Sequence, residues 1–272
     1  MAFCLLNYNM QVLETGQYSG EVAGVCGGAG LFTSLTTYDS KSFNGALHYH
    51  ENAHFSFVLN GGCIEKKHVS YSCLPGKLQY YSAGEPHQVT QILPASRRIN
   101  LEIEDGFFKH YRVSDQDLQN ATENPEAKFL MIRIYRELMA GDVASPVSIQ
   151  MLLLQLISQT STSRPNGQVP HWTNTVRTIL QDRWNEKVTL TELSLESNVH
   201  PVTISRYFSA YFSCTLGEYM RKIKVEKALC LIKSSALPLT EIAYSCGFAD
   251  QSHFIRSFKE FTGCLPTAYR RY

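Results

Sequence analysis

Residues 239–270 read LTEIAYSCGFADQSHFIRSFKEFTGCLPTAYR, and much of this stretch repeats a segment that begins with LTEL at Leu190. The two copies start 49 residues apart, and the offset becomes 50 between Val199 and Ile204. At the longer offset the matching pairs are Arg206 and Arg256, Phe208 and Phe258, Cys214 and Cys264, and Tyr219 and Tyr269. A repeat of this length predicts one supersecondary unit that is used twice.

Each copy is typical of a short helix, a tight turn and a second helix. Before the first helix, the Thr189 hydroxyl and the Glu192 carboxylate are spaced for a capping box. Asn198 and Gly247 occupy equivalent turn positions, and both residue types enter positive φ at low cost. Two apolar pairs, each spaced four residues apart, predict the buried face of each second helix: Ile204 with Phe208, and Phe254 with Phe258.

The opposite face of each second helix carries side chains that suit the edges of DNA bases, because arginine pairs well with guanine and glutamine with adenine. These residues are Val202, Thr203, Ser205 and Arg206 in the first copy, and Gln251, Ser252, His253 and Arg256 in the second. An ordinary solvated helix face explains one such copy equally well. Two copies favour a DNA-binding surface.

A longer helix is predicted between the copies, from Glu218 to about Ser234, after a second capping signal at Thr215. Roughly 17 residues at ~1.5 Å per residue make a helix about 25 Å long. Together with the width of the flanking units, this length brings the two polar faces to a separation of about one turn of B-DNA, ~34 Å. One chain would then contact two successive major grooves.

From about Val176 to Tyr272 the sequence resembles the DNA-binding domain of the AraC/XylS family of bacterial transcription regulators. The residues of the second copy that carry the resemblance are Ile242, Ala243, Gly247, Phe248, Gln251, Ser252, Phe254, Phe258, Lys259, Gly263, Pro266, Tyr269 and Arg270. The resemblance implies that the two polar faces, together with Lys259, bind double-stranded DNA. Two departures are mild: Ser213 stands where the family usually has glycine, and Pro238 replaces the usual Ser or Thr cap.

The same resemblance implies a cytoplasmic bacterial protein that pairs as a homodimer through its first domain, responds to a small-molecule effector and works on RNA polymerase, as an activator or a repressor.

The distribution of charge along the chain agrees with DNA as the partner of the second part. From His171 onward there are 13 Lys and Arg against 9 Asp and Glu, a net of +4, while the first 170 residues hold 12 against 15, a net of −3. The modest excess predicts few phosphate contacts and a shallow salt dependence.

The first part of the chain has a different pattern of apolar and polar residues. Between Gly45 and Glu104, short segments with period-two alternation are broken by glycine and proline, which predicts an antiparallel sandwich or barrel. From Pro125 the period becomes helical. Two apolar stripes follow: Phe129, Ile132, Leu138 and Met139, then Ile149, Leu152, Leu153, Leu156 and Ile157. These helices cover the barrel or, as we expect for part of their surface, pair with a second copy.

We therefore expect a multidomain fold. An all-β cupin-like barrel to about residue 110 and helices over 125–159 form a ligand-sensing and dimerisation domain, residues 1–159. A linker spans 160–170, and an all-α domain with two helix-turn-helix units joined by a long helix spans 171–272.

The eight cysteines include no C-x-x-C pair, so we expect small buried thiols in a reducing compartment. The first ten residues lack the pattern of a signal peptide, and no apolar run is long enough for a membrane helix.

A cluster of histidines lies within the predicted barrel. His48, His50 and His54, two and four residues apart, are expected on one side of a strand, and a turn at Gly84–Pro86 presents His87. The segments GALHYH and GEPH resemble the two motifs of the cupin superfamily, which implies a metal site at His48, His50 and His87; histidine rather than an acidic residue at position 54 departs from that pattern. The alternatives are a ligand pocket lined by these histidines and Tyr81, or purely structural histidines.

Three functions remain open at this stage. The first is a transcription regulator, not an enzyme, whose barrel binds a small molecule. The second is a metal-dependent cupin-type enzyme or metal sensor fused to a DNA-binding domain, with a divalent metal as cofactor. The third is a first domain that acts only as a dimerisation scaffold.

Overall fold

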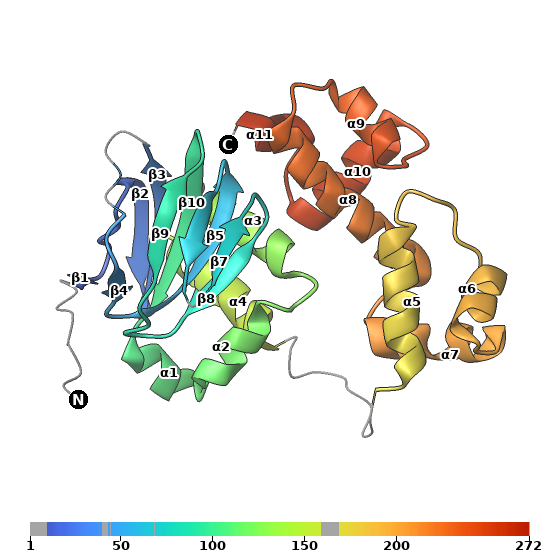
Figure 1. Cartoon of the computed structure of the whole chain (residues 1–272), viewed down its shortest axis with the longest axis horizontal. Helices are drawn as coiled ribbons and strands as arrows, with labels where there is room; N and C mark the ends of the chain where they lie inside the picture. Colours follow the sequence, from blue (N-terminus) through green and yellow to red (C-terminus); the bar gives the residue numbers. More distant parts are fainter. Residues whose placement is uncertain (1–9, 40–42, 44, 68, 159–168, 272) are drawn as a thin grey trace, which may run out of the picture. The chain divides into compact units, whose positions relative to one another are not determined.

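The computed structural model describes residues 10–39, 43, 45–67, 69–158 and 169–271. The chain divides into two compact units, Met1–Thr160 and Ser161–Tyr272. The first unit holds the strands and four helices, and the second is helical (Figure 1). The predicted fold class, a β domain with following helices and then an all-α domain, is therefore confirmed. Residues 160–168 of the predicted linker and residues 1–9 lie outside the described residues.

The strands of the first unit form three sheets. The largest has the order β2-β3-β10-β5-β8, the second has β7-β6-β9, and in the third β1 pairs in parallel with β4. Their bounds are β1 Gln11–Leu13, β2 Glu21–Gly28, β3 Leu31–Tyr38, β4 His48–His50, β5 Ala53–Asn60, β6 Cys63–Lys66, β7 Ser70–Cys73, β8 Leu78–Tyr81, β9 Gln88–Ile92 and β10 Ser96–Ile103. The alternation seen after Gly45 thus marks real strands, and β1 to β3 extend the β region upstream of it.

Strand β10 shows why the alternating pattern matters. It lies in the middle of the largest sheet, between β3 and β5, and all but one of its residues are buried. Ile99, Leu101 and Ile103 occupy one face, while Arg98, Asn100 and Glu102 on the other face are buried as well, each at most 4% exposed. The polar face of this strand therefore points into the unit, toward polar partners, and not toward solvent.

Four helices follow the strands: α1 Asp105–Tyr111, α2 Asp115–Ala121, α3 Ala127–Ala140 and α4 Ser145–Ser158. In Figure 1, α1 and α2 lie at one end of the strands. Helices α3 and α4 pack against each other and against β2. The apolar residues predicted for α3 and α4 are mostly buried there, but Met139 is exposed.

The second unit contains seven helices among its described residues: α5 His171–Asp182, α6 Leu190–Ser197, α7 Pro201–Phe212, α8 Leu216–Ser234, α9 Leu239–Ser245, α10 Gln251–Thr262 and α11 Pro266–Arg271. Helix α6 with α7, and α9 with α10, are the two repeated helix-turn-helix units, and α8 joins them. With 19 residues, α8 starts slightly earlier than predicted and is about 28 Å long at ~1.5 Å per residue.

Local signals in the repeat are confirmed. Thr189 and Glu192 form the complete capping box at the start of α6. Asn198 and Gly247 both adopt positive φ, at 52° and 70°. The change of offset lies just after these residues, because two residues separate Asn198 from α7 whereas three separate Gly247 from α10. The second turn is thus one residue longer, and the added length places Asp250 as the N-cap of α10.

Each repeat has its own core. The pair Ile204 and Phe208, and the pair Phe254 and Phe258, are buried as predicted, at 4% exposure or less. In the first copy they join a cluster that also contains Val176 and Leu180 of α5. Apolar burial of this kind is the main stabilising contribution to small helical units.

Candidate DNA interface and histidine cavity

The second helices of the repeats, α7 and α10, present the predicted DNA-contacting residues; we call them the recognition helices. Ser205, Arg206 and Val202 of α7 are exposed, and Thr203 is half-buried. On α10, Ser252, Arg256 and Lys259 are exposed, while Gln251 and His253 are half-buried. Every predicted residue of this set therefore has accessible surface, and each set shares one helix.

The N-terminal turns of the two recognition helices are built differently. In α7, Pro201 occupies the first turn and the Val202 backbone N–H donates to Nδ1 of His200, 3.3 Å away. In α10, the N-cap Asp250 accepts from the backbone N–H of His253 at 2.7 Å. A proline in the first turn and an Asp N-cap are both favourable helix starts.

Gln251 has a partner inside the second repeat. Its Oε1 atom accepts a hydrogen bond from the Thr240 hydroxyl at 2.8 Å, which joins the start of α9 to the start of α10. The side-chain amide nitrogen retains its two N–H donors. The oxygen also keeps its second lone pair, so this hydrogen bond positions the Gln251 amide without using up its hydrogen-bonding capacity.

The two repeats are held to each other by a contact around Gly247. The Lys224 ammonium, from α8, donates to the Gly247 carbonyl at 2.7 Å. A Cβ atom at Gly247 would lie 2.8 Å from the carbonyl oxygen of Asn185, which precedes α6. This close approach and the positive φ both require glycine here. The recognition helices are therefore parts of one packed unit.

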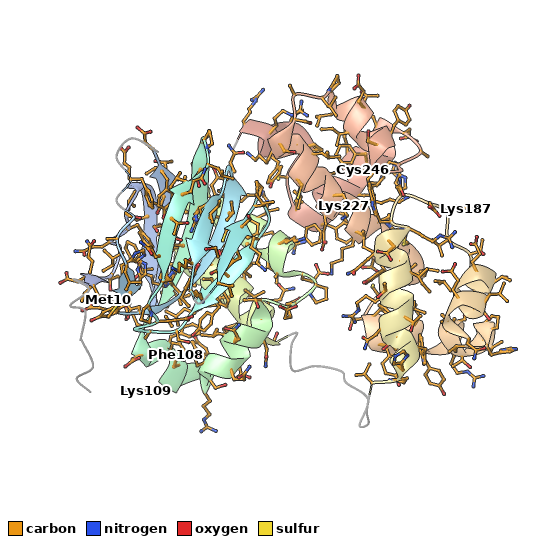
Figure 2. All side chains as sticks on the ribbon, in the orientation of Figure 1. Met10, Phe108, Lys109, Lys187, Lys227 and Cys246 are labelled. Carbon is orange, nitrogen blue, oxygen red and sulfur yellow. The ribbon has the colours of Figure 1, made fainter. Side chains whose placement is uncertain are left out.

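Cationic side chains lie on several elements of this unit. Arg177 of α5, Lys187 before α6 and Lys227 of α8 are exposed, and Figure 2 labels the two lysines. The Lys227 ammonium lies over the Trp184 ring, 5.7 Å from its centroid. Such a contact orients the charge without neutralising it.

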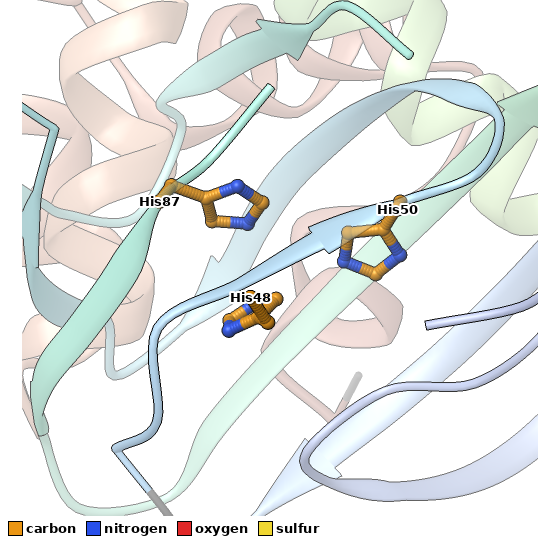
Figure 3. Close-up of side chains that lie close together, drawn as sticks. All are labelled: His48, His50 and His87. Atoms are coloured by element: carbon orange, nitrogen blue, oxygen red, sulfur yellow. The ribbon is translucent and has the colours of Figure 1, made fainter. Parts of the chain in front are cut away.

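The histidines of the first unit converge on one small cavity. His48 and His50 lie on β4, and His87 forms an isolated β-bridge with His48 from the segment opposite (Figure 3). One ligand atom from each of these three residues lies within 4.8 Å of the others. His54 also lines the cavity, but the prediction that it shares one strand with His48 and His50 is wrong: a bend at Glu51 and Asn52 separates β4 from β5.

Hydrogen bonds orient two of the imidazoles. Nδ1 of His48 lies 2.9 Å from the Ala46 carbonyl oxygen, and Nδ1 of His87 lies 3.1 Å from that of Glu85. A carbonyl can only accept, so each Nδ1 carries the proton and each Nε2 keeps a lone pair. By contrast, Nδ1 of His50 and of His54 are buried with no hydrogen-bond partner among the described residues.

Burial keeps these imidazoles neutral. Burial, and then the neighbouring His87 and His48, lowers the pKa of His50 to about 3. Burial likewise lowers the pKa of His87 to about 4, lowers that of His48 and takes that of His54 well below its ordinary value. Neutral imidazole is the form that binds a metal or accepts a hydrogen bond. The donor set and its carbonyl partners thus fit a divalent ion.

The cavity itself is small. Its volume is about 20 Å³, and a buried water molecule needs ~10–15 Å³ on the same scale. Besides the histidines and the predicted Tyr81, its lining includes Tyr18, Tyr38, Arg98 and Asn100. These four residues were not predicted from the sequence. For Arg98 and Asn100 the available signal was their alternation with apolar residues along β10.

Tyr81 connects the cavity to a buried carboxylate. Its ring stacks on His54, with centroids 4.7 Å apart, and its hydroxyl donates to Glu65 at 2.7 Å. Glu65 is fully buried and also accepts from Gln79 at 3.2 Å. Tyr18 makes a similar link on another side, donating to Glu102 at 2.5 Å. Hydrogen bonds thus tie two tyrosines of the cavity wall to the buried carboxylates of Glu65 and Glu102.

A profile of a family described as a helix-turn-helix domain matches residues 193–272, which include both recognition helices. The C-terminal unit contains a helix-turn-helix domain. The HTH-type transcriptional activator RhaS of Salmonella arizonae is 26% identical over 182 residues, which are 66% of this chain and 64% of that protein. The chain thus aligns with less than two thirds of the length of this relative.

Two further similarities cover different shares of the chain. The HTH-type transcriptional regulator GbdR of Pseudomonas aeruginosa is 28% identical over 93 residues, 34% of this chain and 25% of that protein. Among solved structures, ToxT from Vibrio cholerae is 10% identical and covers 89% of this chain and 98% of that one, with a TM-score of 0.38.

Proposed function

We propose that the protein is a sequence-specific, double-stranded-DNA-binding transcription regulator. The observation that carries the proposal is the pair of helix-turn-helix units, held in one packed unit, with polar and basic side chains on both recognition helices. Two such helices fit successive major grooves. The relatives quoted above are named as transcription regulators, which supports this function over that of an enzyme. A regulator of this kind works in the cytoplasm with RNA polymerase as its partner.

The test is a gel-shift assay with DNA upstream of its own and neighbouring genes. The full-length protein and residues 171–272 are compared on the same fragments, with a scrambled fragment as control. We expect retention of at least one promoter fragment at a protein concentration that leaves the scrambled DNA free. Failure of the full-length protein to discriminate between the fragments would contradict the proposal.

We propose that the protein pairs as a homodimer through the surface near the α3–α4 connection. Met139, Val143, Val147 and Met151 are all more than half exposed there, while the apolar residues that the sequence suggested for pairing are mostly buried within the unit. Val147 and Met151 lie one turn apart on α4. Helix α4 contains no charged residue, so two copies facing each other would meet no like-charge repulsion. Pairing would raise the effective affinity for DNA.

We propose that the first unit is the sensor, because its cavity gathers buried polar groups that recognise a ligand. A small-molecule effector larger than a few atoms enters only if lining side chains move, since the cavity holds about one water molecule. A thermal-shift assay against a metabolite panel tests this proposal. Stabilisation that is lost in His50→Ala and Tyr81→Phe supports it, whereas no response to any compound favours a dimerisation scaffold.

The cavity size favours a divalent metal ion as a second candidate ligand, held by His48, His50 and His87. The ion would supply a fixed positive charge among neutral imidazoles. Metal analysis of protein purified without chelators separates the two ligands. One metal per chain, reduced in His48→Ala and His87→Ala, supports the ion; absence of metal rejects the metal sensor and the metal-dependent enzyme together.

A further inference from the structure

A second buried cluster of reactive side chains lies beside the histidine cavity. Cys63 on β6 and Cys73 on β7 are directly opposite each other in an antiparallel pair, and both are fully buried. Their sulfur atoms and a carboxylate oxygen of Glu65 all lie within 4.8 Å of one another. The function proposed above uses neither cysteine.

The two sulfur atoms have opposite electrostatic surroundings. An N–H of the Arg98 guanidinium donates to Sγ of Cys63, whereas the Cys73 thiol itself donates to Glu65 at 3.4 Å. A permanent cation favours a thiolate over a thiol, and a carboxylate acceptor favours the protonated thiol. The neighbouring Cys73 thiol and the Arg98 cation lower the pKa of Cys63. The neighbouring Cys63 sulfur, followed by burial, raises the pKa of Cys73.

We propose that Cys63 and Cys73 are a redox-active pair that forms a disulfide when the protein meets a hydroperoxide. Directly opposed residues of antiparallel strands have Cα atoms ~4.5–5.5 Å apart, which lies within the ~4.4–6.8 Å typical of disulfides. The bridge therefore requires side-chain rotation rather than movement of the strands. Cys63, beside the cation, is the attacking sulfur, and Cys73 is the resolving thiol.

The chemistry balances with the hydroperoxide as the oxidant. The Cys63 thiolate attacks the terminal oxygen, the O–O bond breaks, and an alkoxide or hydroxide leaves, taking a proton from solvent; Cys63 becomes a sulfenic acid. The Cys73 sulfur then attacks the Cys63 sulfur. The S–S bond forms, the S–O bond breaks, and water leaves with the Cys73 proton. Overall, two thiols are oxidised to a disulfide. An organic hydroperoxide is reduced to an alcohol and one water molecule, and hydrogen peroxide is reduced to two water molecules.

Arg98 favours oxidation over metal binding at this cluster. A cation held by Cys63, Glu65 and Cys73 would lie next to the fixed charge of the guanidinium, which opposes its binding. Arg98 also lines the histidine cavity, so this side chain joins the cavity lining to Cys63. Disulfide formation removes the Cys73 hydrogen bond to Glu65, the carboxylate that also holds Tyr81 in the cavity wall.

The test is peptide mapping of the full-length protein after treatment with hydrogen peroxide and alkylation. We expect a Cys63–Cys73 cross-linked peptide that dithiothreitol removes. In Cys73→Ser, we expect Cys63 to stop at a sulfenic acid that dimedone traps. The matched control is Cys230→Ser, which removes an exposed thiol and should leave cross-linking unchanged. In Arg98→Gln, cross-linking should slow about three- to fourfold for each unit by which the Cys63 pKa rises above the assay pH, because the thiolate fraction falls while the nucleophilicity of the thiolate increases.

The cross-link is read without DNA, so its failure is distinguishable from failure of the proposed regulator function. Alkylation of both Cys63 and Cys73 after peroxide treatment, at a dose that oxidises Cys230, would overturn the proposal. Stoichiometric Zn²⁺ retained by wild type but lost in Cys63→Ser, without any cross-link, would also overturn it. If Arg98→Gln does not fold by circular dichroism, dimedone trapping in Cys73→Ser still decides the outcome.

Discussion

At the residue scale, Arg256 is the clearest candidate for a base contact. It is exposed on α10, one turn beyond Ser252, which is also exposed. If Arg256 donates to guanine, Arg256→Ala costs ~1–3 kcal/mol at one half-site and relaxes the preference there. Binding to a set of single-base operator variants measures this effect. An equal loss on every sequence would assign Arg256 to a phosphate.

Ser213, which stands where the family usually has glycine, is expected to lower the free energy of unfolding. It adopts φ of 56° as the C-cap of α7, where the equivalent Gly263 caps α10 at 76°. A residue with a side chain is less stable than glycine by ~1 kcal/mol or more in the left-handed backbone conformation. We therefore expect Ser213→Gly to raise the free energy of unfolding by about 1 kcal/mol. Ser209→Gly, inside α7, is the control and should lower it by a similar amount. Urea denaturation measures both; a destabilised Ser213→Gly would contradict the prediction.

Which residues were predictable depends on how local their signal is. Asn198, Gly247 and the capping pair at Thr189 and Glu192 act within a few positions, so the sequence identifies them. The cavity residue Arg98 was not identified, because its burial depends on strands β3 and β5 that flank β10 from distant parts of the chain. A charged residue in an alternating strand is normally taken to face solvent.

At the scale of elements, α4 offers the sharpest test of self-association. The variant has Glu in place of Val147 and Met151. In a two-fold dimer each new carboxylate occurs once in each copy, so like charges face each other across the interface. We expect this variant to weaken the dimer by on the order of 3 kcal/mol, or ~100-fold in Kd, measured by analytical ultracentrifugation. Val69→Glu, at a residue 76% exposed elsewhere in the unit, is the control. A wild-type monomer, or a variant that remains fully dimeric, would contradict the assignment.

The histidine cavity predicts a pH dependence of stability in protein freed of metal. The pKa values of His50 and His87 are lowered to about 3 and about 4, below the ordinary ~6.5. The unfolded chain therefore binds more protons below pH 6.5, so the stability is complete above that pH and falls as pH drops toward the folded values. Each group contributes about 1.4 kcal/mol per pH unit in this window.

Urea titrations between pH 7 and pH 4.5 measure this slope. We expect His50→Leu to flatten it by the contribution of one group. His110→Leu, at an exposed histidine of the same unit, is the matched control for the substitution. Identical slopes for wild type and His50→Leu would show that His50 is not held neutral by the fold.

Among the elements, the long periodic segments were predicted best. Helices α3, α4 and α8 follow their apolar spacing closely, whereas α1 and α2, each of seven residues, were missed. Strands β1 and β4 have three residues each, too few to display a period. The misplacement of His54 follows from the same limit, since a two-residue bend divides what looks like one strand.

At the scale of the whole molecule, two unequal recognition helices imply a directional protein–DNA complex. The α7 turn begins with His200 and Pro201, while the α10 turn begins with Asp250 and contains Gln251 bound to Thr240. In the proposed complex, one scaffold would therefore present different chemistry to each groove. The net charge of +4 after residue 170, from 13 basic and 9 acidic residues, predicts a shallow salt dependence of binding.

The most direct test is a selection of bound sequences from random DNA with residues 171–272, followed by footprinting of the selected site. We expect two different short motifs, with centres about one helical turn, ~10 base pairs, apart, bound in one orientation. Arg206→Ala should relax one motif and Arg256→Ala the other. A single motif, two identical motifs in a palindrome, or no enrichment over random DNA would contradict the central claim.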